Sequence, residues 1–146
     1  MRKFINIIEG KKITDDWFTD NSFIAYKRPD KRESFRIAKD SGVVDTLEGP
    51  VKYSSGDYIM TGPKGEEYPI SPDTFAKLKN DNGDGTASPK KIEKLCKLAD
   101  HDGMITLKYN GSQLAYNKGE DIIVRHDQDD YGVVKKEIFD QTYEKV

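Results

Sequence analysis

Residues 51–60 read VKYSSGDYIM, and residues 68–75, after a short turn, read YPISPDTF. Apolar and polar residues alternate at the start of the first stretch, a pattern typical of a half-buried β-strand. The turn between the two stretches contains proline and glycine, which favour turn conformations. Ser71 and Pro72 form a helix-start signal, because serine caps a helix and proline fits its first position. The stretch therefore predicts a strand, a turn, a second strand and a short helix.

A later part of the chain repeats this pattern. Residues 114–124 read LAYNKGEDIIV, and residues 132–139 read GVVKKEIF. Asp57 aligns with Asp121 at an offset of 64 residues, whereas the offset just upstream is 63 because of one extra residue, Glu120. We interpret the two stretches as diverged copies of one unit, with a β-bulge at the extra residue. Chance similarity between two β-hairpins is the alternative.

We expect an α+β fold in which two diverged copies of a small antiparallel β-rich unit, with short helices, are joined by a linker and one amphipathic helix. A unit of about 65 residues would be only marginally stable alone, so the copies should share a core. The boundaries follow from the turn-rich stretch NDNGDGTA that begins at Asn80. They place the first unit at residues 1–79, the linker at residues 80–88, and the helix with the second unit at residues 89–146.

The helix after the linker is predicted from its start signal and its periodicity. Ser88 and Pro89 resemble a cap and a first helical position. Apolar residues follow at helical spacing: Ile92, Leu95, Cys96 and Ala99. The rest of the core is expected at apolar positions of the predicted strands and short helices: Val51, Tyr53, Ile59, Ile70, Phe75, Leu114, Tyr116, Ile123, Val134 and Phe139.

Short motifs in both units carry a resemblance to known proteins. TLEG, GDYI, GEEYP and PDTF, which begin at residues 46, 56, 65 and 72, resemble the pattern TLEG, PGDYI, KGE-x-YP, PDIF and TYE of a family of short tailed-phage and prophage proteins. In the second unit, DYGVV at residues 130–134 and TYE at residues 142–144 look like related proteins named for a PGDYG motif.

The chain departs from these patterns at three places. Ser55 stands where the family has proline before GDY, Gln128 and Asp129 stand where the second motif has Pro-Gly, and residues 76–78 replace the TYE ending. The resemblance implies a shared fold unit and a phage or prophage origin. It implies no catalytic residue.

Composition limits the classes of partner. The chain has 146 residues and a net charge of −2, so no strong overall field attracts nucleic acid or an anionic membrane. Cys96 is the single cysteine, which excludes an intramolecular disulfide and is typical of a cytoplasmic protein. No apolar run approaches the roughly 18 residues that a membrane span needs. We therefore expect a cytoplasmic protein without a membrane partner.

Two patterns suggest metal binding, but neither is complete. His101 and His126 each precede an aspartate, as in HD-type hydrolases, yet a catalytic metal needs more ligands than they supply. The stretch at residues 80–85 has the oxygen-rich start of an EF-hand loop, but Lys91 stands where that loop needs an acidic ligand. Turn and surface roles are the alternative, and we expect no metal and no cofactor.

Basic residues gather in two places where they could contact phosphates. The first cluster has aromatic neighbours and comprises Lys27, Arg28, Lys31, Arg32 and Arg36. The second lines the predicted helix and comprises Lys90, Lys91, Lys94 and Lys97. A solvated surface is the alternative and agrees better with the net charge, so we expect no nucleic-acid partner.

The sequence contains no Gly-x-Ser-x-Gly elbow and no phosphate-binding loop. Our leading hypothesis is a non-enzymatic binding or accessory protein of phage or mobile-element origin, with a protein partner or a small ligand. The alternative is a small enzyme that acts on a nucleotide or a protein side chain in a cleft between the two units.

The candidate binding residues occupy equivalent places in the two units. They are Asp57, Tyr58, Glu66, Glu67, Asp121, Asp129, Asp130 and Tyr131. The acidic turns at residues 65–67 and 129–131 form the expected functional edge, which would bind a basic partner with an affinity that falls as salt rises. Solubility is the alternative role of these acidic turns.

Overall fold

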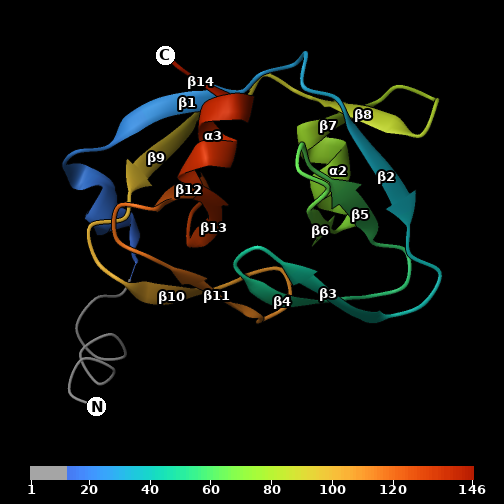
Figure 1. Ribbon diagram of the computed structural model, residues 1–146, viewed down its shortest axis with the longest axis horizontal. Helices are drawn as coiled ribbons and strands as arrows, with labels where there is room; N and C mark the ends of the chain where they lie inside the picture. The colour runs from blue at the N-terminus through green and yellow to red at the C-terminus, as the bar shows by residue number, and fades with distance from the viewer. Residues whose placement is uncertain (1–12) are drawn as a thin grey trace.

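The computed structural model describes residues 13–146 and shows two five-stranded antiparallel sheets side by side (Figure 1). Sheet I runs in the order β6 (Glu67–Ile70), β5 (Tyr58–Thr61), β2 (Glu33–Ile37), β8 (Thr86–Pro89) and β7 (Lys79–Asp81). Sheet II runs in the order β13 (Asp130–Lys135), β12 (Asp121–Asp127), β9 (Lys94–Leu98), β1 (Phe23–Lys27) and β14 (Tyr143–Lys145). The α+β class with antiparallel sheets is thus confirmed.

Two helices and two hairpins complete the fold, together with the 3-10 helix η1 (Asp15–Thr19). The short helices are α2 (Pro72–Leu78) and α3 (Lys136–Thr142). The hairpins pair β3 (Gly42–Thr46) with β4 (Gly49–Tyr53) and β10 (Gly103–Thr106) with β11 (Gln113–Tyr116). β4 contacts β11, so the hairpins form a continuous floor below both sheets (Figure 1). Among residues 13–146, no helix is long and apolar enough to cross a membrane.

The two sheets have the same strand order and the same pairing register. Arg36 of β2 pairs with Ile59 of β5, and Lys97 of β9 pairs with Ile123 of β12. At the other edge, Lys79 pairs with Pro89 in sheet I, and Tyr143 pairs with Lys27 in sheet II. The hairpin and the helix are also inserted at equivalent places: β3–β4 follows β2 and α2 follows β6, whereas β10–β11 follows β9 and α3 follows β13. A shared ancestry of the two halves stays a prediction.

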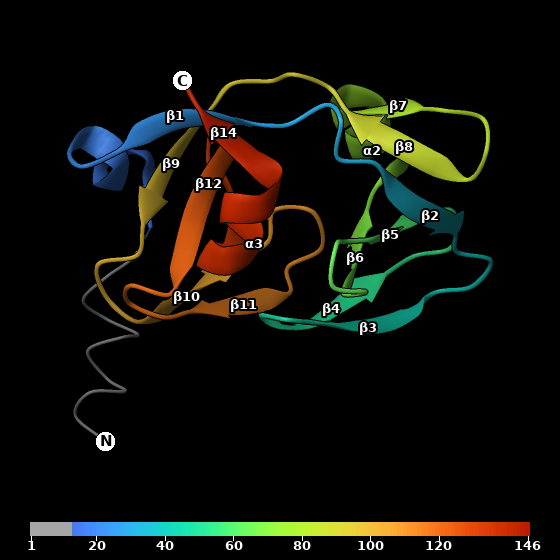
Figure 2. The same ribbon diagram turned by 45° about the horizontal axis from the view of Figure 1, so that its top comes forward.

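One strand of each sheet comes from the other half of the sequence. β1 precedes all of sheet I but pairs with β9 and β14 of sheet II. β8 follows α2 and pairs with β2 and β7 of sheet I, and the chain then crosses to β9. Both crossing segments pass over the same side of the molecule (Figure 2). A boundary at residue 79 therefore does not separate the sheets, and residues 80–88 form a hairpin rather than a linker.

The helix predicted after Ser88 is wrong. Residues Thr86–Pro89 form β8, and Lys94–Leu98 form β9. The apolar residues at helical spacing also fit a strand that is covered on both faces, because Leu95 of β9 packs against one core cluster and Cys96 lies in another. Tertiary pairing with β1 and β12 overrides the local helix signal.

The two short helices begin as predicted. In α2 the Ser71 hydroxyl accepts a hydrogen bond from the backbone N–H of Thr74, and Pro72 occupies the first turn. Phe75 of α2 stacks on Tyr58, with ring centroids 4.0 Å apart. Phe139 of α3 stacks in the same way on Tyr143 at 4.4 Å. Each helix thus packs against a strand of its sheet through aromatic contact.

The predicted core is largely confirmed. Buried members are Val51, Ile59, Phe75, Leu114, Tyr116, Ile123 and Phe139. Tyr53, Ile70 and Val134 are half-buried, because each packs at the margin of a cluster. The turn before each central strand is also equivalent. Gly56 and Gly119 both have positive φ (92° and 75°), and each donates its N–H to an alanine carbonyl.

The β-bulge predicted at Glu120 is wrong. Glu120 lies in the turn between β11 and β12, where its N–H bonds to the Asn117 carbonyl at 3.1 Å. The extra residue lengthens that turn and leaves the strand register intact. A register shift does occur in β12, but between Arg125 and Asp127.

Candidate functional site

A cavity of about 300 Å³ lies between the two sheets and takes residues from both. α2 supplies Ser71 and Thr74, and α3 supplies Ile138 and Thr142. The tip of the β3–β4 hairpin contributes Leu47 and Glu48. Other apolar side chains of the wall are Val51, Ile70, Leu78, Ile92, Leu107, Leu114 and Val134. The site therefore combines an apolar body with polar groups from both halves, as small-molecule sites do.

A buried polar cluster forms part of the cavity wall. Lys27 Nζ and Lys79 Nζ donate hydrogen bonds to the same oxygen, Oε1 of Glu33, at 3.2 and 3.0 Å. The Tyr68 hydroxyl donates to that oxygen as well, at 2.7 Å. Lys27 comes from sheet II and the other three residues come from sheet I, so the cluster ties the sheets together. Only 5% of the Lys79 and Glu33 side chains is exposed.

Two ammonium groups compete for one carboxylate in this cluster. Burial and the neighbouring Lys27 charge together lower the pKa of Lys79 to about 7, although Glu33 acts in the opposite direction. The pKa of Lys27 stays raised because Tyr68 and Glu33 outweigh its own burial. The pKa of Glu33 is lowered by Lys27 and Lys79 despite burial. Lys79 is thus the member of the cluster that loses its proton most readily.

A lysine–histidine pair faces the same cavity from sheet II. Lys94 Nζ lies 2.8 Å from Nδ1 of His126. Burial lowers the pKa of Lys94 to about 8, with Lys27 as a further cause. The His126 side chain lines the cavity and is exposed. Desolvation and the nearby lysines lower its pKa, so neutral His126 accepts the hydrogen bond from Lys94.

Unlike Lys27 and Lys79, Lys94 has no carboxylate partner among the described residues. Within residues 13–146, no aspartate or glutamate oxygen lies within 4.0 Å of Lys94 Nζ. Asp130 also lines the cavity and raises the pKa of Lys94 from a distance. This end of the cavity thus holds Lys27, Lys79 and Lys94 against Glu33 and Asp130.

The hairpin tip gives the cavity a different character at Glu48. Burial raises the pKa of Glu48 to about 7, with Asp121 and Glu66 as further causes and Lys135 opposing them. A carboxyl group of this kind gains a proton near neutral pH. The cavity therefore has a cationic part beside Lys79 and an acidic, protonatable part beside the hairpin.

The predicted functional edge is split between cavity and surface. Glu66, Glu67, Asp130 and Tyr131 line the cavity. Tyr131 also donates a hydrogen bond to Asp15, which anchors η1 to sheet II. The two turns lie on opposite halves, and each turn region reaches the helix of the other half. Lys64 pairs with Glu137 of α3 at 2.7 Å, and Lys77 of α2 pairs with Asp127 at 3.9 Å.

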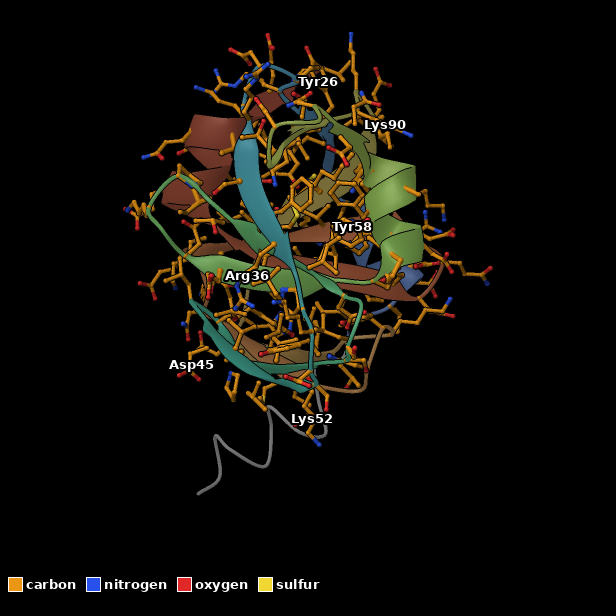
Figure 3. All side chains as sticks on the ribbon, turned by 90° about the vertical axis from the view of Figure 1, so that its right-hand side faces the viewer. Tyr26, Arg36, Asp45, Lys52, Tyr58 and Lys90 are labelled. Carbon is orange, nitrogen blue, oxygen red and sulfur yellow. The ribbon has the colours of Figure 1, made fainter. Side chains whose placement is uncertain are left out.

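The remaining predicted residues lie outside the cavity. Asp57 and Asp121 are buried, and each accepts a hydrogen bond at 2.7 Å from a turn N–H, that of Ser54 and that of Asn117. The acidic residue of the GDY motif thus braces the turn that precedes the central strand. Tyr58 packs within sheet I beside α2 (Figure 3). Asp129 is exposed at the tip of the β12–β13 turn with a φ of 56°.

The two histidines lie in separate places. His101 bonds to Asp100 at 2.5 Å and to the Tyr116 hydroxyl at 2.6 Å, below sheet II. His126 faces the cavity with Lys94. No group of three or more His, Cys, Asp or Glu side chains in residues 13–146 is arranged to hold a metal ion.

The first basic cluster of the sequence is dispersed. Lys27 points into the buried polar cluster, and Arg28 donates hydrogen bonds to carbonyls at the end of α3. Arg32 and Arg36 form wide, exposed ion pairs with Asp84 and Glu67, at 3.8 and 3.9 Å.

Sequence reasoning missed Glu33 and Lys79 as site residues. Neither lies in a motif, and the chain contains many similar charged residues. Lys27 and Lys94 were recognised only as members of basic clusters. Their meeting depends on the strand exchange between the sheets, for which the sequence carries no local signal.

Comparison with known proteins gives one family. The sequence profile described as PGDYG protein matches residues 49–144, from the start of β4 to β14. No curated protein matches the chain, and no solved structure matches it. The matched span contains the turn, strand and helix signals of both halves. Because it covers more than half of the chain, the protein belongs to the PGDYG family.

Proposed function

We propose that the protein binds a small organic anion in the cavity between the two sheets. The observation that carries the proposal is the group of lysine amines at one end, where Lys27 and Lys79 share a single oxygen of Glu33. Among residues 13–146, the Nζ of the nearby Lys94 has only neutral His126 within hydrogen-bond reach. An anionic group in this position would give Lys94 the carboxylate partner that it lacks among the described residues.

The shape of the site supports an organic ligand of limited size. A volume of about 300 Å³ is at the lower end of the range for small-molecule sites. Apolar side chains from both halves would cover the body of the ligand. The confined setting strengthens charge attraction relative to bulk water, so a single carboxylate gains much from the lysines.

Ligand-dependent stabilisation tests the proposal. Butyrate and phenylacetate are compared with their neutral amides, butyramide and phenylacetamide, and with inorganic phosphate. We expect the two carboxylates to raise the unfolding temperature in a concentration-dependent way, and the amides to have no effect. Equal effects of acid and amide would contradict the proposal.

A matched pair of lysine variants locates the binding. Lys94→Met should weaken carboxylate binding at least about tenfold, which corresponds to the loss of one charge-assisted hydrogen bond. Lys52→Met, on the exposed side of β4 (Figure 3), should leave the affinity unchanged. Unchanged affinity in Lys94→Met would place any observed binding elsewhere.

We also propose that the protein is cytoplasmic, has a phage or mobile-element origin, and arose by duplication of one unit. The single cysteine supports the location. The matching order and register of the two sheets support the duplication. A ligand cavity between the two copies would then belong to neither copy alone.

A further inference from the structure

We propose that Lys79 acts as a nucleophilic amine that condenses reversibly with the carbonyl group of an α-keto acid bound in this cavity. The inference rests on the proposed function, because the carboxylate of the keto acid is the anion that the cavity holds. It adds a covalent step and a narrower ligand class: a carboxylate with an adjacent carbonyl group.

The position of Lys79 suits this role. Lys79 begins β7 at the edge of sheet I, directly after α2, and lines the cavity. Its side chain is 5% exposed, and hydrogen bonds to Glu33 at 3.0 Å and to the Tyr68 hydroxyl at 3.5 Å fix its amine. A held amine at a cavity wall is oriented for attack on a bound carbonyl carbon.

The neighbouring charges keep the amine reactive. Only the neutral form of a lysine attacks a carbonyl group, and desolvation beside a second cation is one way in which proteins produce it. Lys27 is that second cation, since its ammonium shares the Glu33 oxygen. Burial and Lys27 lower the pKa of Lys79 to about 7, so a large fraction is neutral at physiological pH. Lys27 and Lys94 remain to hold the carboxylate.

The reaction balances with groups present in the cluster. The nitrogen lone pair of Lys79 forms a bond to the carbonyl carbon, and the carbonyl π electrons move to the oxygen, which takes a proton from the Tyr68 hydroxyl. Glu33 removes a proton from the nitrogen and passes it to the Tyr68 oxygen, which restores the Tyr68 hydroxyl. Loss of the oxygen as water, with the two protons of the amine, leaves an imine. No oxidant or reductant is consumed.

Reductive trapping on the full chain tests the inference. The protein is incubated with pyruvate and cyanoborohydride, then digested and mapped by mass spectrometry. We expect a reduced adduct on Lys79, competition by butyrate, and no adduct with lactate, which has the carboxylate but lacks the carbonyl group. Labelling spread evenly over surface lysines, or absent from Lys79, would overturn the inference.

The variants and the pH profile provide further checks. Lys79→Arg should abolish the adduct, and Lys52→Met should retain it. Labelling of Lys79 in the wild-type chain should reach half of its maximum near pH 7, whereas surface lysines react only at higher pH. This measurement needs no variant, so it stands even if Lys79→Arg does not fold. A profile for Lys79 like that of surface lysines would contradict the inference.

The outcomes separate the two proposals. If butyrate and lactate bind but pyruvate leaves no adduct on Lys79, the covalent step is wrong and the anion site stands. If none of the three carboxylates binds and no adduct forms, both proposals are wrong.

Discussion

Glu33 and Lys94 occupy equivalent positions in the two sheets. Glu33 begins β2 and pairs with Ala87 of the exchanged strand β8, whereas Lys94 begins β9 and pairs with Ala25 of the exchanged strand β1. Both side chains line the cavity. The same position thus carries opposite charges in the two halves, and this difference makes the cavity asymmetric.

Removing the charge of Glu33 should be far more damaging than removing that of Lys79. Glu33→Gln leaves the Lys27 ammonium without its counter-charge and removes the acceptor that Lys27, Lys79 and Tyr68 share, and we expect a loss of about 3–5 kcal/mol in the free energy of unfolding. Lys79→Met leaves Lys27 and Glu33 as a matched pair and should cost much less. Urea titration measures both, with the exposed Glu137→Gln as control, expected within about 0.5 kcal/mol of wild type. Equal losses in the two buried variants would contradict this account.

Titration of Lys79 should also make the free energy of unfolding depend on pH. Its pKa is about 7 in the folded chain against about 10.5 when unfolded, so the unfolded state binds more protons between these values. Wild-type stability should therefore rise with pH across this window relative to Lys79→Met. The measurement is the difference between the two unfolding free energies from about pH 6 to about pH 9. A constant difference would show that Lys79 titrates normally.

The buried Asp121, which corresponds to Asp57 of the GDY motif, should contribute to the stability of the fold. Asp121→Ala leaves the N–H of Asn117 without its acceptor, and we expect a loss of about 1–3 kcal/mol. Asp129→Gly, at a φ of 56°, should be neutral or slightly stabilising, because glycine adopts positive φ without strain. Thermal unfolding of both variants tests the contrast. A large loss in Asp129→Gly would reveal a role that its exposed position does not explain.

Phe139 should be essential for the packing of α3. It is 2% exposed and contacts both Phe23 of β1 and Tyr143 of β14, with ring centroids at 5.7 and 4.4 Å. Phe139→Ala should reduce the free energy of unfolding by about 3–5 kcal/mol. Denaturant titration checks this value, and a loss below about 1 kcal/mol would show that α3 is held by other contacts.

Local signals in the sequence were sufficient for several elements. Alternation at Val51 and Tyr53 predicted β4, and Ser71 with Pro72 predicted the start of α2. Such features depend on neighbours a few residues apart, which the sequence displays directly. The same locality caused the error at residues 89–99, because a spacing that fits a helix was read without the strands that pair with it.

The sequence by itself determined the β-rich character, the two short helices and most of the core, since these follow from periodicity and capping within short windows. The tertiary structure alone decided the candidate site. Lys27, Glu33, Lys79 and Lys94 meet because β1 and β8 pair across the two halves. That pairing brings together residues as far as 67 positions apart, and charged side chains of ordinary type give no local sign of such a partner.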